Sequence, residues 1–341
     1  MKNVAIVGAT GAVGQELLAI LAERNFPLKS LKLLASARSA GKKIKFKGED
    51  ITVQELRHDS FEGVDLVLSS AGGSISKEYM PSAVKAGAVV VDNTSYFRMN
   101  PEIPLVVPEI NPQEIKKHKG IIANPNCSTI IMLLPLFPLY KAFGVERVHA
   151  CTYQAASGAG ATAMEELRLE SKALAEGKTF TRTVIPYQYA FNLFPHNSPY
   201  NSGSPEKAAA VKAPNGYCEE EWKMVAETHK IFGDNNLRVN ATCVRVPILR
   251  AHSEALNIRL SKKASVAEIY DVLRSSPGVE ILEEPSQNRW PMPIDASGKD
   301  PVLVGRIRID QSQDNTFDMW IVGDQIRKGA ALNAIQIAEL L

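Results

Sequence analysis

A glycine-rich turn directly after a short apolar run constrains the fold more than any other feature of this sequence. Residues 4–7 are apolar and suit a buried strand, and residues 12–24 carry leucines on one helical stripe. Glycines let the backbone turn tightly and approach a pyrophosphate, while a helix N-terminus offers N–H groups and partial positive charge. A plain tight turn would also use glycine, but strand, loop and helix in this order favour a dinucleotide-binding domain. The predicted cofactor contacts in this turn are Gly8, Thr10, Gly11, Ala12, Val13 and Gly14.

The end of the second predicted strand, residues 31–35, indicates which dinucleotide would bind. NAD sites commonly place an acidic residue there to bind the ribose hydroxyls. Here the stretch carries Arg38 and Ser39 and no acid, with Lys42 and Lys43 nearby. These side chains suit a 2′-phosphate and favour NADP over NAD, although a solvated basic hairpin would have the same composition.

The first third of the chain alternates short apolar runs with helical stretches, which is typical of a parallel sheet covered on both faces. We expect further strands at residues 64–70, 88–92 and 121–123, and a hairpin around Gly48 at residues 42–53. The fold class is therefore α/β, with an N-terminal Rossmann-type, doubly wound parallel sheet.

The pattern changes after residue 126. Longer alternating runs predict a mostly antiparallel sheet with one wet face, at residues 145–154, 237–246, 255–260 and 302–309. Helical patterns interrupt them at 161–176, 219–232 and 266–275, and residues 196–216 are rich in Pro, Ser, Asn and Gly and predict a loop. We therefore expect an NADP-binding domain over 1–126, completed by a C-terminal helix in 323–341, and a second, α+β domain over 127–322.

Composition excludes several classes of protein. The chain has 341 residues and a net charge of +2, so its overall charge indicates neither nucleic acid nor a membrane surface as a partner. Its longest apolar run, residues 130–140, has 11 residues and two prolines, whereas a membrane span needs roughly 20. The four cysteines form no CxxC pair and have no histidines at zinc spacing. We therefore expect no metal and reduced thiols in the cytoplasm.

Cys127 stands between a predicted strand and an apolar helix, in the segment NPNCST. A thiol at a helix N-terminus has a lowered pKa because the dipole favours the thiolate, which is a competent covalent nucleophile. A small buried residue at the helix start would fit the same position. The combination with a nicotinamide-binding turn favours chemistry, because hydride transfer to or from an aldehyde can run through a thiohemiacetal and a thioester on cysteine.

Six segments resemble the aspartate-semialdehyde dehydrogenase family over essentially the whole chain. They are VAIVGATGAVG, NPNCST, YQAASGAG, EEEWKM, RVPILRAH and VGDQIRKGAALNA, in the family's order and at compatible spacing. The resemblance implies NADPH-dependent reduction of 4-phospho-L-aspartate to L-aspartate 4-semialdehyde and phosphate. That step feeds lysine, threonine, methionine and diaminopimelate synthesis. It also implies that residues 127–322 form a catalytic and dimerisation domain, and that the protein is a homodimer or a dimer of dimers.

The same resemblance assigns roles to individual residues. Cys127 would form the thioester, His252 would act as acid and base, and Gln154 would orient the substrate. Arg245 would hold the substrate carboxylate and Glu220 its ammonium group, although the adjacent Glu219 and Glu221 leave that choice ambiguous. The remaining implied contacts are Arg98, Asn126 and Lys223 for the substrate, and Ser157, Gly158 and Gln325 for the cofactor.

Two alternatives share part of this pattern. An N-acetyl-glutamyl-phosphate reductase would use the same glycine turn, cysteine and histidine, but its acylated substrate offers no cation to Glu220. A non-catalytic NADP-binding sensor would keep the glycine turn and need neither thiol nor base. Loss of reduction in a Cys127→Ala variant would exclude the sensor.

Overall fold

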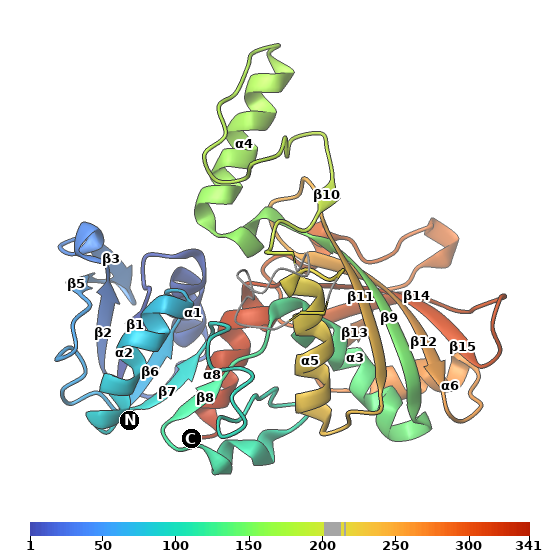
Figure 1. The fold of residues 1–341 in the computed structure, drawn as a ribbon, viewed down its shortest axis with the longest axis horizontal. Helices are drawn as coiled ribbons and strands as arrows, with labels where there is room; N and C mark the ends of the chain where they lie inside the picture. Colours follow the sequence, from blue (N-terminus) through green and yellow to red (C-terminus); the bar gives the residue numbers. More distant parts are fainter. Residues whose placement is uncertain (201–212, 215) are drawn as a thin grey trace. The chain divides into compact units, whose positions relative to one another are not determined.

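The computed structural model describes residues 1–200, 213, 214 and 216–341, and the chain divides into two compact units. The first unit comprises Met1–Asn126 and Ala330–Leu341, and the second comprises Cys127–Gly329 (Figure 1). Most of the loop predicted at 196–216 lies outside the described residues.

The first unit is built on a parallel sheet of six strands. All five pairs of neighbouring strands are parallel, which confirms the predicted doubly wound sheet. The central strands are buried along their apolar runs because helices cover both faces. In sheet order the strands are β5 (Gln54–Glu55), β2 (Leu28–Ala35), β1 (Lys2–Val7), β6 (Leu66–Ser69), β7 (Val89–Asp92) and β8 (Ile121–Ala123).

Helices and a small hairpin complete the first unit. The predicted hairpin is present as β3 (Lys43–Phe46) and β4 (Glu49–Thr52), which pair antiparallel. The C-terminal helix α8 (Leu332–Glu339) packs with the first helix in one hydrophobic cluster, in which Ile335 and Leu21 are both fully buried. The other helical elements are α1 (Ala12–Glu23), η1 (Ala37–Ser39), α2 (Gly73–Lys85) and η2 (Pro112–Lys117).

The second unit is built on a mixed sheet of seven strands. Four of its neighbouring pairs are antiparallel and two are parallel, which confirms the mostly antiparallel prediction. In sheet order the strands are β10 (Phe194–Pro195), β11 (Arg238–Arg245), β9 (Val145–Gln154), β12 (His252–Leu260), β15 (Thr316–Gly323), β14 (Val302–Ile309) and β13 (Val279–Ile281). β12 begins three residues before the predicted start because its first residues are polar but buried.

One face of this sheet is covered by helices and the other is half-exposed. α3 (Cys127–Phe143) packs on the middle strands, with α5 (Glu219–Phe232) and α6 (Val266–Arg274) beside it. The remaining helical elements are η3 (Ala156–Ala159), α4 (Ala161–Ala175), η5 (Pro285–Gln287), α7 (Pro293–Ala296) and the π-helical turn η6 (Arg327–Ala331), which leads into α8. Throughout the described part of the chain, every helix is too short or too polar to cross a bilayer.

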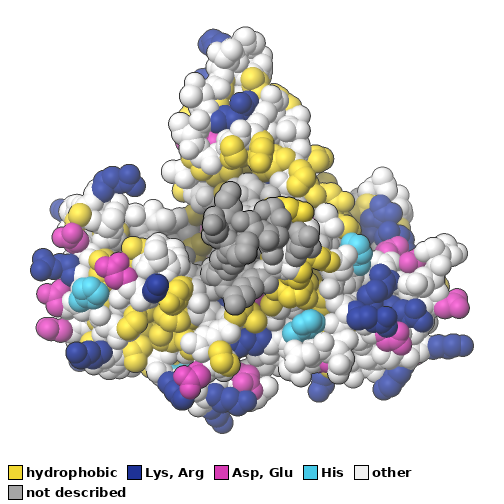
Figure 2. Space-filling view, in the orientation of Figure 1, with side chains coloured by type: hydrophobic (Ala, Val, Ile, Leu, Met, Phe, Trp, Pro, Cys, Tyr) yellow, Lys and Arg dark blue, Asp and Glu magenta, His cyan; other side chains and the backbone are white. Residues whose placement is uncertain are grey.

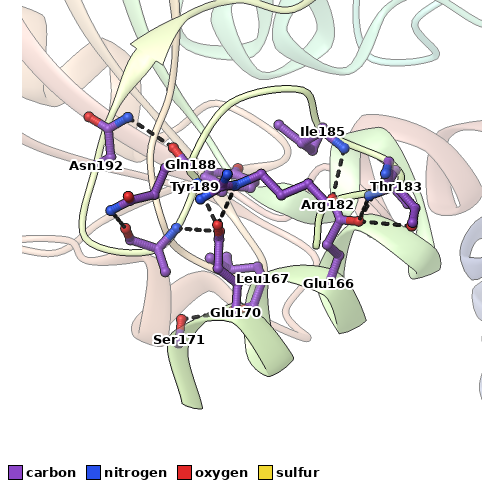
Figure 3. Close-up of polar contacts among 12 residues, drawn as sticks. Glu166, Leu167, Glu170, Ser171, Arg182, Thr183, Ile185, Gln188, Tyr189 and Asn192 are labelled. Atoms are coloured by element: carbon purple, nitrogen blue, oxygen red, sulfur yellow. Dashed lines mark hydrogen bonds and ion pairs between the residues drawn. The ribbon is translucent and has the colours of Figure 1, made fainter. Parts of the chain in front are cut away.

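Helix α4 projects away from the seven-stranded sheet, and two of its carboxylates fasten the segment that follows it (Figures 1 and 3). Glu166 accepts hydrogen bonds from the backbone N–H groups of Thr183, Val184 and Ile185. Residues 182–190 form no helix or strand of their own, so these carboxylates supply the partners that their N–H groups need. Figure 2 shows hydrophobic side chains on this projection; the exposed ones are Leu169, Val184, Tyr187, Phe191 and Leu193.

Candidate active site

A cavity of about 490 Å³ lies at the carboxyl ends of the central strands of the first unit. Its lining includes Gly8, which follows β1, and Ser70, which follows β6. The strand order reverses between these two strands, and open α/β sheets bind their ligands at such a switch point. The predicted turn residues Thr10 and Gly11 also line this cavity. The position and lining fit a dinucleotide.

Two glycines of the turn are required by close approach of the backbone. Gly8 has a φ of +86°, and a Cβ there would lie 2.6 Å from the carbonyl oxygen of Ser70. At Gly14 a Cβ would lie 2.3 Å from the carbonyl oxygen of Gly8, so this glycine lets α1 pack against the turn. Any side chain at either position would therefore displace the turn that faces the cavity.

The residues after β2 are divided between the cavity and its surroundings. Ser36 and Ala37 line the cavity, Arg38 next to them is exposed, and Ser39 is buried. Sequence reasoning missed Ser36 because it considered only basic and hydroxyl groups later in the segment. It also missed Glu55 of β5, which lines the same cavity and brings a carboxylate to the site.

Arg98 and Asn126 are both buried in the first unit. Arg98 donates from Nε to the carbonyl oxygen of Asn124 at 2.9 Å and from Nη2 to that of Asn93 at 2.8 Å. The guanidinium therefore ties the backbone of Asn124, three residues before Cys127, to that of Asn93.

Cys127 is the first residue of α3, which confirms the prediction of a cysteine at a helix N-terminus. Its side chain is half-buried, and all four cysteines are thiols. A Cβ at Gly329 would lie 2.9 Å from the Cβ of Cys127, so only glycine lets η6 approach this residue. The next residue, Ser128, is fully buried and ties the start of α3 to the sheet, as its hydrogen bond shows.

Gln154 and Glu220 come together from β9 and α5. The Nε2 of Gln154 donates to Ser128 Oγ at 2.6 Å and to Glu220 Oε1 at 3.1 Å. Lys223, one helical turn along α5, places its Nζ 3.6 Å from the other carboxylate oxygen of Glu220. Both Gln154 and Glu220 are buried, so the contacts lie in a shielded environment.

The three adjacent glutamates of α5 have different surroundings, although Glu219 and Glu220 both lie near Lys223. Glu221 accepts from the backbone N–H groups of Cys218 and Cys243 and closes the N-terminus of α5. Glu219 lies 3.6 Å from Lys223 on the helix surface. Glu220 is the glutamate whose carboxylate contacts Gln154.

Arg245 and His252 converge on the turn that follows β9. Arg245 donates from Nη1 to the carbonyl oxygen of Ala155 at 2.8 Å, and His252 Nδ1 accepts from the N–H of Ala155 at 3.0 Å. A Cβ at Gly158 would lie 2.9 Å from Nη1 of Arg245 and 3.2 Å from Nε2 of His252. The predicted residues Gln154, Gly158, Arg245 and His252 are therefore brought together in the second unit.

The surroundings of His252 determine its proton arrangement. Burial lowers its pKa well below the ordinary value, Arg245 and His196 lower it further, and Glu220 opposes them. The ring is therefore neutral, and because Nδ1 accepts the Ala155 N–H, the proton is on Nε2. That Nε2 is buried and forms no hydrogen bond to any described residue. In this state His252 can donate a proton from Nε2 but cannot accept one there.

Ser157 and Gln325 brace the loop around His252. Gln325 is buried and donates from Nε2 to Ser157 Oγ, while its Oε1 accepts from the backbone N–H of Ala251 at 2.9 Å. Ala251 has a φ of +71°, an uncommon conformation for a residue with a side chain, and it directly precedes His252. Arg250 pairs with Asp324 at 2.6 Å next to this brace. Both polar ends of Gln325 are thus used within the protein.

Several contributors to the site were not predicted. Ser128 holds Gln154, Ala155 holds both Arg245 and His252 through its backbone, and Asn197 accepts from Arg245 Nε at 3.2 Å. Ser128 follows Cys127 directly, so its place in NPNCST was a usable indication. The backbone groups of Ala155 have no side-chain signature, and the sequence alone offers no way to find them.

Comparisons with known proteins agree with this geometry. Residues 3–118 match the semialdehyde dehydrogenase NAD-binding domain, and residues 136–328 match the semialdehyde dehydrogenase dimerisation domain. An aspartate-semialdehyde dehydrogenase of Synechocystis is 56% identical over 339 residues, covering 99% of this chain and 97% of that protein.

Two solved structures extend the agreement to the fold. The structure of aspartate semialdehyde dehydrogenase II from Vibrio cholerae complexed with ASA has a TM-score of 0.94 at 44% identity, covering 100% of this chain and 98% of that one. The Candida albicans enzyme, solved with NADP, has a TM-score of 0.74 at 27% identity, covering 100% and 98%. The resemblance seen in the motifs is confirmed: the chain belongs to the aspartate-semialdehyde dehydrogenase family of oxidoreductases.

Proposed function

We propose that the protein reduces 4-phospho-L-aspartate to L-aspartate 4-semialdehyde and phosphate with NADPH, through a thioester on Cys127. The step would supply lysine, threonine, methionine and diaminopimelate synthesis in the cytoplasm. The observation that carries the proposal is the convergence of Gln154, Glu220, Arg245 and His252 around the sheet end on which α3, with Cys127 first, is packed. The V. cholerae relative, solved with ASA, supports the choice of substrate.

The charges of the cluster match those of an aspartyl substrate. Arg245 would bind the α-carboxylate; neither of its hydrogen bonds to Asn197 and Ala155 uses Nη2. Glu220 would bind the α-ammonium group, a contact that an N-acylated substrate could not make. Lys223 and Arg98 would bind the phosphoryl group, with Asn126 and Gln154 positioning the reacting carbonyl.

The proton arrangement of His252 suggests how the steps are divided. The Cys127 thiolate would attack the acyl carbon, the carbon–oxygen bond to phosphate would break, and the thioester would remain. A bound nicotinamide cofactor supplies hydride to that carbonyl carbon. His252 would donate a hydrogen bond from Nε2 to the oxygen that becomes negative, and this oxyanion would form the aldehyde as the carbon–sulfur bond breaks and the Cys127 thiolate leaves. We therefore assign His252 the role of donor to this oxygen, rather than removal of the thiol proton.

NADP is the cofactor that the first unit fits best. Gly8, Thr10 and Gly11 line the cavity, and the turn that they form with Ala12, Val13 and Gly14 would hold the pyrophosphate. Arg38 and Ser39, which follow the lining residues Ser36 and Ala37, would hold the 2′-phosphate. Ser157 and Gly158 would contact the nicotinamide, and we propose that Gln325 acts on it through Ser157. An Arg38→Leu variant should raise KM for NADPH about tenfold, the scale of one charged hydrogen bond, and leave KM for NADH unchanged. Equal effects on both cofactors would contradict this assignment.

A covalent adduct provides the decisive test of the reaction. The protein is mixed with 4-phospho-L-aspartate in the absence of NADPH and digested for mass spectrometry. We expect an aspartyl adduct on the Cys127 peptide, and its loss in Cys127→Ala. Cys151→Ala is the matched control because that thiol is also half-buried, and it should keep the adduct. Full reduction by Cys127→Ala would overturn the proposal.

We further propose a homodimer formed through the half-exposed face of the seven-stranded sheet. This face has a cavity of about 640 Å³ lined by Cys151, Met292 and Trp320, and Tyr153 packs beside Trp320 with ring centroids 5.4 Å apart. The match to the family's dimerisation domain supports a second copy as the occupant. Met292→Glu should shift the protein to monomers in sedimentation, whereas an unchanged mass would place the interface elsewhere. A dimer of dimers would appear as twice the dimer mass.

A further inference from the structure

Glu254 is a fully buried carboxyl group that the proposed mechanism does not use. It lies in β12, two residues after His252, and has none of its surface exposed. Neither of its carboxyl oxygens forms a hydrogen bond to any described residue. An acidic side chain is almost never fully buried without a partner, so this position calls for a physical explanation.

The neighbours of Glu254 include two more buried polar groups. Residues two apart on a strand share a face, so Glu254 lies on the same face as His252, and Thr152 lies directly opposite it on β9. Gln154 is its diagonal neighbour on the same face, roughly 7–8 Å away between backbones and within reach of a long side chain. Gln154 Oε1 is also buried and forms no hydrogen bond to described residues. The buried Thr152 hydroxyl lies opposite Cys243 of β11, whose thiol is its neighbour. Three polar groups thus gather beneath α3.

The electrostatic surroundings keep this carboxyl group neutral. An unpaired buried carboxylate costs several kcal/mol, so a buried acid of this kind protonates instead. Burial raises the pKa of Glu254 well above its ordinary value, and the nearby Glu220 raises it further. Other titratable groups around the site include His252, which is neutral, His196, whose pKa burial lowers to about 4, and Cys243, whose pKa burial raises. The charged groups there include Arg245 and Lys223. Glu254 can therefore serve as a hydrogen-bond donor.

We propose that Glu254 is a protonated positioning residue, which joins Thr152 and the Oε1 of Gln154 through a buried water. A buried water needs two to four polar partners, and these three groups supply them. A hydrogen-bond donor near Glu254 favours the orientation of the Gln154 amide in which Oε1 points toward Glu254. In that orientation Nε2 points toward Ser128 and Glu220. A flipped amide would set its oxygen against the Glu220 carboxylate. The inference deepens the proposed function because it concerns the residues that would position the substrate.

Infrared spectroscopy tests the protonation of Glu254 apart from activity. We expect the carbonyl band of a protonated carboxyl group at neutral pH, and its loss in Glu254→Gln. Glu166→Gln is the matched control, since Glu166 is buried but accepts backbone hydrogen bonds and has a lowered pKa, and it should keep the band. Absence of the band from the unmodified protein would overturn the proposal. This readout is independent of the Cys127 adduct, so failure of one does not imply failure of the other.

Kinetics separates a neutral positioning group from an ionised one. Glu254→Gln keeps a neutral donor and acceptor, so its kcat should remain within about threefold, well under the effect of one lost buried hydrogen bond. Glu254→Met keeps the length of the side chain but removes both the hydrogen-bond donor and the acceptor. Its kcat should fall about tenfold, with little change in the dependence of kcat on pH. Equal losses in both variants would show that the carboxylate is required and would overturn the proposal. The Gln variant and the infrared band decide the matter even if the Met variant does not fold.

Discussion

Two places in the second unit, α4 and one end of the sheet, bury carboxylates in different ways. On α4, Glu166 and Glu170 have hydrogen-bond partners at both of their oxygens, supplied by backbone N–H groups, the Thr183 hydroxyl and Arg182 (Figure 3). At the sheet end, Glu254 has no such partner among the described residues, while Glu220 contacts the amide of Gln154. Both places bury acid groups, but at the sheet end Glu254 is left without a hydrogen-bond partner among the described residues.

This difference distinguishes carboxylates that support the fold from polar groups that are available for binding or catalysis. On α4 each acid replaces the hydrogen bonds that an irregular segment cannot make to itself, so its bonding capacity is used up within the fold. At the sheet end, the Nε2 of His252 and the Oε1 of Gln154 remain open to other groups. Buried polar atoms without partners are uncommon in folded proteins and mark places where a ligand, a water or a reacting group belongs.

Removing His252 should give the largest effect and confine it to catalysis. His252→Asn should lower kcat by roughly 10²–10⁴, the scale of a lost catalytic donor, because no other group would donate to the oxygen that becomes negative. Steady-state kinetics measures this, and the thermal unfolding midpoint should stay nearly unchanged. A loss below tenfold would remove His252 from the donor role.

Arg245 lies at the sheet end and Arg182 pairs with Glu170 of α4, so substitutions of these two arginines compare the two places directly. Arg245→Leu should raise KM for the aspartyl substrate about tenfold to a hundredfold, the scale of one charge-assisted hydrogen bond to the carboxylate. Arg182→Leu is the matched control, because Arg182 pairs with Glu170 at 2.5 Å and should leave KM unchanged. An unchanged KM in Arg245→Leu would exclude it as the carboxylate clamp.

Strong periodicity explains which elements the sequence predicted well. The strand predicted at 145–154 and the helix predicted at 219–232 coincide with β9 and α5 at both ends. Their apolar residues recur at the spacing of the element, so local pattern and final packing agree. The prediction missed α2, which is polar and contains Pro81, the eight-residue strand β15, and the short strands β10 and β13.

The site itself explains where the sequence prediction fell short. β12 was predicted only from 255, whereas the polar residues His252, Ser253 and Glu254 before it are all buried within the strand. Polar residues at functional positions interrupt the hydrophobic alternation of a strand. The interruption makes that part of the strand hard to recognise from the sequence. Motifs could identify Cys127 and His252, whereas the backbone of Ala155 and the strained Ala251 depend on tertiary geometry that no local pattern records.

Glu170 should matter for stability and not for turnover. Glu170→Ala leaves the N–H groups of Tyr189 and Ala190 without their carboxylate. The free energy of unfolding should fall by about 1–3 kcal/mol, the cost of unsatisfied buried donors, with Arg182 discounted because it is partly exposed. Urea unfolding and kcat on the same sample give both readouts. A large loss of kcat without loss of stability would join α4 to the catalytic machinery.

Lowering the pH should weaken the contacts that Glu166 of α4 makes. This effect should be smaller than those of the His252, Arg245 and Glu170 substitutions. Burial by itself would raise the pKa of Glu166, but hydrogen bonds from Ile185, Thr183 and Val184 outweigh it and leave the pKa below its ordinary value of 4.5. A depressed folded-state pKa means that the stabilisation is present above pH 4.5 and is lost as the pH falls through the lower folded value. Glu166→Gln cannot titrate, so the difference in unfolding free energy between it and the unmodified protein should shrink as the pH falls below 4.5. A difference that stays constant with pH would show that the carboxylate charge contributes nothing to holding this segment.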